Sequence, residues 1–253
     1  MLACAVDSVL DVMSATSSQP PGVSRATADR RVTLLAYGVR MDVAYRTEVG
    51  HVRSRNEDAL LARPERGVLA VADGLGGHPA GDVASMTALS SVDGAGLRAD
   101  SSEDDLRAAA AAAHQAVLDA AAAEPGRTGM GTTLVLAAVT GDSALVLHVG
   151  DSRAYHLAAD GGLSPVTEDH GLHGYLTQAL GLDREVAPDV ARVECPPGSR
   201  LLLCTDGLTN MVDDADLAGL LGRGSAQGAC DALVEAALEA GGVDNVTVVV
   251  VAF

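Results

Sequence analysis

The sequence of 253 residues contains no lysine and no tryptophan, and aromatic residues make up only 2% of it. Its basic side chains other than histidine are therefore all arginines. The absence of lysine excludes a Walker-type phosphate loop and a Schiff-base lysine. With so few aromatic residues, the core must be built from Ala, Val and Leu, and a hydrophobic content of 48% is enough for a sizeable one.

Long apolar runs and paired cysteines are also missing. No run approaches the ~20 apolar residues that a membrane-spanning helix needs. Asp7 and Asp11 interrupt the first apolar stretch, and no basic residue precedes it, so we do not expect a signal peptide. None of the four cysteines forms a CxxC pair, and we expect a reducing cytoplasm as the location.

Positive charge is scarce, and the formal net charge is −17. Such an acidic surface repels nucleic acid and anionic lipid, so we expect neither nucleic acid nor a membrane as a partner. Acidic groups gathered in one place could instead hold hard divalent cations.

The first 40 residues differ in composition from the rest. The stretch 14–22 is rich in Ser, Pro and Gly and is typical of a linker. We interpret 1–40 as a poorly ordered N-terminal extension, although a wrongly assigned start codon explains it equally well. The length of the remainder suits one domain over 41–253.

From residue 41 onward, short strands alternate with turns and longer helices follow. We predict strands over 68–72, 132–139, 144–149, 153–158, 200–204 and 246–253, and helices over 80–92, 103–123, 214–222 and 225–241. The turn 140–143 predicts an antiparallel hairpin. The uninterrupted apolar runs 201–204 and 248–251 indicate strands buried on both faces. Strands next to strands, with helices in separate blocks, favour an α+β fold.

Five acidic motifs share one local design, in which a carboxylate stands at the edge of an apolar strand beside Gly or Asn. They contain Glu57 and Asp58, Asp73 and Gly74, Asp151, Asp206, and Asp244. Two divalent ions can activate a bridging water and neutralise phosphoryl oxygens, and Mg²⁺ and Mn²⁺ prefer oxygen ligands. The sequence therefore predicts a metal-dependent phosphate-ester hydrolase centred on Asp73.

Each motif alone has an ordinary explanation. An Asp-Gly pair after a strand is usually a turn, and Asp151 could be only a hairpin residue. Glu57 and Asp58 could be a solvated charge pair, and Asp244 could cap the entry to a strand. Five such motifs in one chain, with Arg53 just upstream of the first, are harder to dismiss.

In their order along the chain, these motifs resemble the metal-dependent protein phosphatases of type 2C, the PPM family, and the bacterial members in particular. The resemblance covers most of 41–253. It is carried by Arg53-x-x-Asn56-Glu57-Asp58-Ala59, Val71-Ala-Asp73-Gly-Leu-Gly-Gly-His78, Gly131-Thr-Thr133, His148-Val-Gly-Asp-Ser-Arg153, Leu176-Thr-Gln-Ala-Leu-Gly181, Cys204-Thr-Asp-Gly-Leu208 and Asp244-Asn-Val-Thr247.

The resemblance implies two packed antiparallel β-sheets flanked by helices, a four-layer α-β-β-α sandwich with the metals in a cleft at one end. It implies two Mn²⁺ or Mg²⁺ ions, a water between them that attacks phosphorus in line, and no phospho-enzyme intermediate. The resemblance also implies a role for each site residue. Asp73 bridges the metals, the Gly74 carbonyl joins one of them, and Asp206 and Asp244 complete the first site. Glu57 contributes to the second site with Asp58 behind it, and Arg53 holds the phosphate. Asp151 and Asp206 are candidates for a third, weaker metal site.

The sequence departs from the family pattern at two places. Where some members have a histidine directly after the bridging Asp-Gly, this chain has Leu75, and His78 three residues later is only an uncertain candidate for a catalytic role. The flap of bacterial members is reduced to 171–175. We therefore expect a more open site and weaker binding of a third metal, and we interpret His170 and His173 as surface loop residues.

The leading hypothesis is thus a protein serine/threonine phosphatase acting on phosphorylated proteins and opposed to a serine/threonine kinase. The alternatives are a phosphatase dedicated to one regulatory phosphoprotein, a non-catalytic binding module with a degenerate site, and a general phosphoesterase for small molecules. The intact Glu57, Asp73, Asp206 and Asp244 argue against the binding module.

Overall fold

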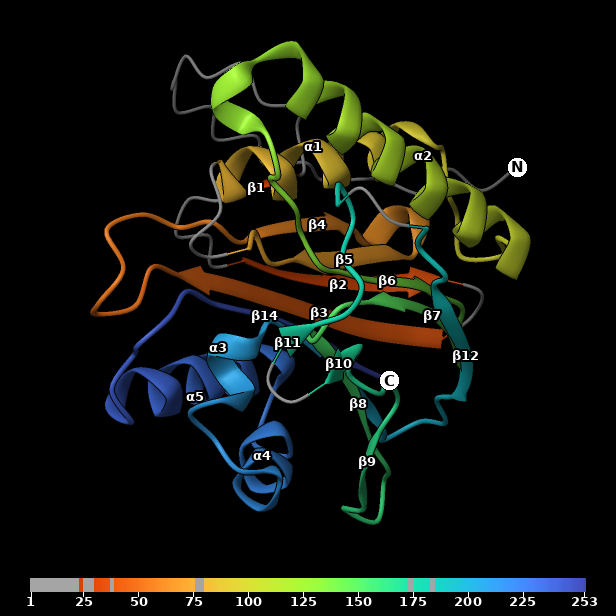
Figure 1. Ribbon diagram of the computed structural model, residues 1–253. Coiled ribbons are helices and arrows are strands. Elements are labelled where there is room, and N and C mark those ends of the chain that lie inside the picture. Colours follow the sequence, from red (N-terminus) through yellow and green to blue (C-terminus); the bar gives the residue numbers. More distant parts are fainter. Residues whose placement is uncertain (1–22, 25–29, 37–38, 76–79, 173–174, 183–184) are drawn as a thin grey trace, which may run out of the picture.

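Two antiparallel sheets packed face to face form the centre of the protein, with helices on both outer sides (Figure 1). The structure, a computed structural model, describes residues 23–24, 30–36, 39–75, 80–172, 175–182 and 185–253. The first sheet has the strand order β1 (Val23–Ser24), β4 (Ala59–Arg63), β5 (Val68–Ala72), β6 (Leu134–Val139), β7 (Ser143–Val149) and β12 (Asp189–Glu194). The second has the order β2 (Arg30–Ala36), β3 (Val39–Glu48), β14 (Val246–Ala252), β13 (Arg200–Cys204), β8 (Arg153–Leu157) and β9 (Leu163–Pro165).

The helices lie in two outer layers. In Figure 1, α1 (Gly81–Gly94) and α2 (Glu103–Ala123) cover the first sheet, and α3 (Asp206–Thr209), α4 (Asp214–Leu221) and α5 (Ala226–Glu239) lie on the side of the second. Single 3₁₀ turns occupy Pro64–Arg66 and Pro125–Arg127, and a separate small hairpin joins β10 (Gly171–Leu172) to β11 (Tyr175–Leu176). This arrangement confirms the predicted α+β class and the four-layer sandwich.

The strands are apolar throughout because both of their faces are buried. In β5, Val68 and Ala70 pack with α1 and α2, whereas Leu69 and Val71 pack in the core between the sheets. The run 201–204 and the run 248–251 divide in the same alternating way between the core between the sheets and the core under α5. This alternation follows from the two-residue period of a strand and confirms that both runs are buried on both faces.

The predicted elements are confirmed with small shifts at their ends. The helix over 103–123 begins where predicted, because Ser102 caps it: its hydroxyl accepts a hydrogen bond from the Asp105 amide, and the Asp105 carboxylate accepts one from the Ser102 amide. The hairpin across 140–143 is present as the β6–β7 pair. The prediction did not include the one-turn helix α3, the strands β2, β3 and β12, or the short strands β1, β9, β10 and β11.

The expected domain boundary at residue 41 falls inside β3, whose residues 39–45 pair with β2. With β1 paired to β4, both sheets therefore include residues upstream of 41. Residues 1–22, with the linker-like stretch 14–22, lie outside the described residues. Within the described part of the chain, no helix has both the length and the apolar character needed to cross a bilayer.

Candidate metal centre

The register of both sheets brings the five acidic motifs to one end of the sandwich. In the first sheet, Ala59 at the start of β4 pairs with Ala72 at the end of β5. In the second sheet, Cys204 at the end of β13 pairs with Val248 near the start of β14 and with Arg153 at the start of β8. The carboxylates that precede or follow these strand ends therefore converge, as the sequence predicts.

Asp73 follows β5 directly and is fixed by the motif at Thr132 and Thr133. The Asp73 amide donates to the Thr133 hydroxyl at 2.9 Å, and the Asp73 carbonyl accepts from the Thr133 amide at 2.9 Å and from the Thr132 hydroxyl at 2.8 Å. Burial, together with the charges of Asp58, Asp206 and Asp151, raises the pKa of Asp73 well above its ordinary value. A neighbouring cation would relieve this repulsion.

Gly74 has no room for a side chain. A Cβ atom built on it would lie 2.3 Å from the Gly81 carbonyl oxygen and 2.7 Å from the Glu57 carbonyl oxygen, both of them rigid backbone atoms. The Gly74 amide donates to the Glu57 carbonyl at 3.2 Å. Glycine is therefore required here so that the loop after β5 can pass against the segment that carries Glu57.

Asp58 is fully buried, and two threonine hydroxyls donate hydrogen bonds to its carboxylate. These contacts were not predicted from the sequence. The Asp58 Oδ2 accepts from the Thr247 hydroxyl at 2.6 Å and from the Thr205 hydroxyl at 2.8 Å, whereas its Oδ1 is buried without a hydrogen-bond partner. Burial raises the pKa of Asp58 to about 7. Both threonines stand in motifs that the sequence singled out, but they are distant from Asp58 along the chain, so their contact with it could not be predicted.

Asp206 begins α3, and Asp151 stands in the turn between β7 and β8. Asp206 and Asp73 are close enough to share a hydrogen bond when one of them is protonated. The Asp206 Oδ1 is buried without a partner, and burial followed by repulsion from Asp244 raises the pKa of Asp206. Burial and the charge of Asp206 raise the pKa of Asp151 to about 6. Both carboxylates line a cavity of about 420 Å³.

Arg53 is one of the cations that face the carboxylates at this end of the molecule. Its Nη2 donates to Asp244 Oδ2 at 2.6 Å, with both side chains partly exposed. This hydrogen bond raises the pKa of Arg53, with smaller contributions from the charges of Glu57 and Asp73. Burial raises the pKa of Glu57. The structure therefore brings together all the predicted site residues that it describes, and His78 lies outside the described residues.

Asn245 holds the segment that carries Arg53 and Glu57. Its Oδ1 accepts from the Glu57 amide at 2.8 Å, and its Nδ2 donates to the carbonyls of Val49 at 2.8 Å and Arg55 at 3.0 Å. In the sequence, Asn245 is distinguished only as the residue next to Asp244. Its side-chain role could not be predicted, because its partners lie about 190 positions away.

At the reduced flap, the described residues form the small hairpin of β10 and β11, which contributes Gly171, Tyr175 and Leu176 to the lining of the cavity. Tyr175 on this hairpin is 79% exposed, and it lines the cavity together with Arg153 and Asp169. His170 lies outside the strands and helices, as predicted for a loop residue, but its side chain is largely covered and only 9% exposed. His173 lies outside the described residues.

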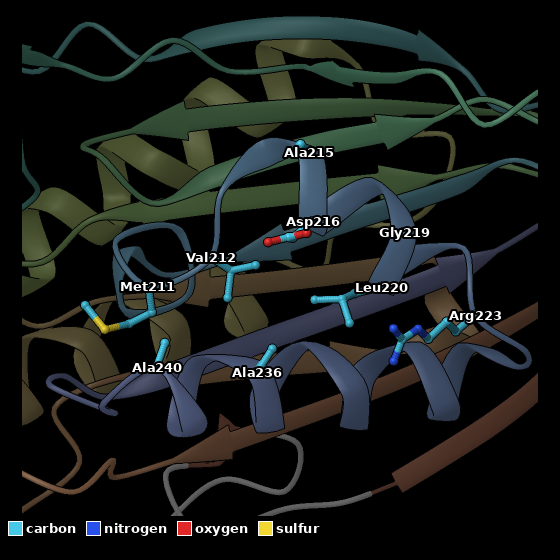
Figure 2. Close-up of a pocket in the computed structure, with 9 residues that line it drawn as sticks. All are labelled: Met211, Val212, Ala215, Asp216, Gly219, Leu220, Arg223, Ala236 and Ala240. Carbon is cyan, nitrogen blue, oxygen red and sulfur yellow. The ribbon is translucent and has the colours of Figure 1, made fainter.

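A second hollow, of about 330 Å³, lies between α4 and α5, and Figure 2 shows the side chains that line it. Its lining is mostly apolar, with Val212 and Leu220 on one side and Ala236 and Ala240 of α5 on the other. Asp216 is the only carboxylate in the lining. The chemistry of a hard cation therefore belongs to the acidic end and not to this hollow.

The raised pKa of Asp58 gives a prediction for the metal-free protein. The folded pKa is about 7 and that of an exposed aspartate is about 4, so the folded protein holds a proton that the unfolded chain lacks. The resulting stability is complete below about pH 4 and is lost as the pH rises through about 7. Asp58→Asn should therefore raise the free energy of unfolding in chelator, and by about 1 kcal/mol more at pH 8 than at pH 6.

Urea unfolding of both proteins at the two pH values measures this difference. Buried histidines such as His148, whose pKa burial lowers to about 4, act in the opposite direction but do so in both proteins. Their effect cancels in the comparison. An equal stabilisation at pH 6 and pH 8 would contradict the raised pKa.

Comparison with known proteins agrees with this geometry. Residues 49–239 match the protein phosphatase 2C family. The serine/threonine protein phosphatase PstP of Mycobacterium tuberculosis is 37% identical over 244 residues, which cover 87% of this chain and 45% of PstP. The chain therefore spans about half the length of that relative. The serine/threonine phosphatase stp of Listeria welshimeri is 33% identical over 83% of this chain and 95% of its own length.

The solved structures include the catalytic domain of PstP in complex with two manganese ions. It superposes with a TM-score of 0.76 at 35% identity, covering 84% of this chain and 97% of that chain. Fold, motif order and sequence identity thus agree over most of the chain. The protein belongs to the protein phosphatase 2C family.

Proposed function

We propose that this protein is a metal-dependent serine/threonine protein phosphatase. The observation that carries the proposal is the convergence of Glu57, Asp73, Asp206 and Asp244 at one end of the sandwich, with Arg53 beside them. Family membership supports the same reaction, the hydrolysis of phosphoserine and phosphothreonine, with phosphorylated proteins as substrates.

The acidic end fits divalent cations. Two of its carboxylate oxygens, on Asp58 and Asp206, are buried without a partner. Burial and mutual repulsion raise the pKa values of Asp73, Asp206 and Asp151, so a cation bound among these carboxylates would stabilise their ionised form. Oxygen-only donors favour Mn²⁺ or Mg²⁺, in line with the two manganese ions of the PstP structure.

We assign the residues as follows. Asp73 would hold both ions, the Gly74 carbonyl, Asp206 and Asp244 would hold the first, and Glu57 would help to hold the second. Asp58, behind Glu57, orients the centre through Thr205 and Thr247. Asp151 with Asp206 offers a place for a third, weaker ion. When bound, such ions supply an activated water and neutralise the phosphoryl group, with no phospho-enzyme intermediate.

Arg53 binds the substrate phosphate. Its guanidinium has a planar fork that matches phosphate oxygens, and it lies at the partly exposed rim of the centre. Its contact with Asp244 holds the guanidinium beside the carboxylates that would hold the cations. We also propose an opposing serine/threonine kinase, because such a kinase must form the phosphorylated substrates. The proposed location is the cytoplasm.

The proposal predicts steady hydrolysis of a phosphothreonine peptide in Mn²⁺, complete loss of activity on chelation, and recovery when Mn²⁺ is added back. Release of inorganic phosphate measures the rate. A non-hydrolysable phosphonate analogue of the peptide serves as the control. Absence of turnover with Mn²⁺, Mg²⁺ and a set of lysate phosphoproteins would overturn the proposal, whereas activity on one lysate phosphoprotein alone would identify a dedicated phosphatase.

A further inference from the structure

His148 and Asp189 are direct cross-strand neighbours. The antiparallel register of β7 and β12 pairs them, and residues opposite each other in such a pair share one face of the sheet, with Cβ atoms about 5 Å apart. His148 is 1% exposed, whereas the Asp189 side chain is 73% exposed at the edge strand. The pair therefore reaches from the interior to the surface.

His170 completes the group from another part of the chain. Its Nε2 lies 3.0 Å from Asp189 Oδ2, and its ring centroid lies 4.6 Å from that of His148. The Gly150 amide donates to Nδ1 of His170 at 3.2 Å, and the His170 amide donates to the Gly150 carbonyl at 2.7 Å. This backbone contact places the His170 ring against His148 and leaves Nε2 to face Asp189.

His148 has no hydrogen-bond partner for either of its ring nitrogens, although both are buried. Burial, with repulsion from His170, lowers the pKa of His148 to about 4, so the ring is neutral and carries a free lone pair at physiological pH. The nearby Gly150 backbone raises the pKa of His148 slightly, against the larger effect of burial. It does not form a hydrogen bond with the His148 ring. A buried polar group without a partner is unfavourable, and a metal ion would satisfy it.

We propose that His148, His170 and Asp189 form a second metal site, which takes Zn²⁺ or a similar borderline transition ion. One ligand atom from each residue lies within 4.8 Å of the other two. Zinc bonds to nitrogen and oxygen are about 2.0–2.2 Å long, so the site must contract modestly, and the exposed Asp189 side chain is free to rotate inward. Two imidazoles with one carboxylate favour zinc, unlike the oxygen-only acidic end.

Zinc binding has a consequence for Gly150. In the metal-free form the His170 ring donates from Nε2 to Asp189 and accepts at Nδ1. When Nε2 gives up its proton to bind zinc, the neutral ring holds its proton on Nδ1, which can no longer accept from the Gly150 amide. The hydrogen bond to Gly150 therefore opens, and the turn that carries Asp151 into the cavity loses one of its attachments.

Calorimetric titration with Zn²⁺ tests this site in a background where the acidic end is disabled, Asp73→Asn/Asp206→Asn, with Mg²⁺ in excess. That background should bind one equivalent of zinc. Added separately to it, His170→Gln and Asp189→Asn should each weaken binding by more than about 10-fold. His156→Gln, a half-buried histidine on β8 outside the cluster, is the matched control and should leave the affinity unchanged.

Thermal unfolding without zinc verifies that each variant is folded, and zinc should raise the unfolding temperature of the background protein but not that of the two ligand variants. The proposal is overturned if the background protein binds no zinc, or if both variants keep its affinity. In either case His170 and Asp189 would be only a hydrogen-bonded attachment for the turn at Gly150, with His148 packed against the His170 ring. Neither result depends on phosphatase activity.

Discussion

Replacement of Asp206 by asparagine is expected to abolish most of the hydrolytic activity and, at the same time, to stabilise the metal-free protein. Cation binding contributes several kcal/mol to the stabilisation of a phosphoryl transition state, and each 1.36 kcal/mol corresponds to a factor of ten in rate. Loss of one carboxylate that holds the cations should therefore lower the turnover of a phosphothreonine peptide on the order of 10³-fold.

The gain in stability has a separate physical cause. In the metal-free fold, burial and the charge of Asp244 raise the pKa of Asp206, and its Oδ1 has no partner. The ionised form is therefore penalised at neutral pH, and a neutral asparagine of the same shape removes that penalty. Asn210, which donates to Oδ2 at 3.0 Å, can still donate to the amide oxygen.

Two measurements test both parts. Thermal unfolding in chelator should show a higher midpoint for Asp206→Asn than for the unchanged protein, and the increase in midpoint on adding Mn²⁺ should be much smaller. Asp104→Asn, at an exposed position in the first turn of α2, serves as the control and should affect neither activity nor Mn²⁺ stabilisation. A variant that retains full Mn²⁺ stabilisation would show that Asp206 does not hold a cation.

The sequence predicted the fold from local signals where those signals are strong. Helix α2 has a cap, an acidic first turn and an alanine-rich body, so its bounds were predicted correctly. Strand β12 alternates between half-buried and exposed residues at the sheet edge, and its weak pattern gave no signal. Helix α3 is one turn long, too short for any helical period to show.

In the candidate metal centre, too, some residues could be identified from local sequence and others could not. The acidic residues could be identified because each lies next to a glycine or asparagine at a strand end, a pattern that is visible along the chain. Residues that act through long-range hydrogen bonds could not be predicted, because nothing local distinguishes them. The Thr205 and Thr247 hydroxyls on Asp58 and the burial of His170 are of this kind, since each depends on how the two sheets are stacked.

Among the residues that act through long-range hydrogen bonds, Asn245 is the one whose substitution we expect to have the largest effect on stability. Its side chain is 4% exposed and satisfies three backbone groups, the amide of Glu57 and the carbonyls of Val49 and Arg55. A buried backbone group left without its partner costs about 1–3 kcal/mol. Asn245→Ala should therefore lower the free energy of unfolding by about 3 kcal/mol or more, even though it removes no charge.

Asn245→Ala should also weaken the response to Mn²⁺, because Glu57 and Arg53 lie on the segment that Asn245 holds. Loss of a group that orients metal ligands typically lowers metal affinity about 10–100-fold, so the Mn²⁺ concentration for half-maximal activity should rise by that factor. The matched control is Asn210→Ala, an exposed asparagine that contacts Asp206 and should cost less than about 1 kcal/mol. Urea unfolding and Mn²⁺ titration of both variants decide the matter. Equal losses in the two variants would show that the hydrogen bonds of Asn245 do not hold the segment at the metal centre, since the Asn210 side chain contacts the Asp206 carboxylate and not the segment that carries Glu57.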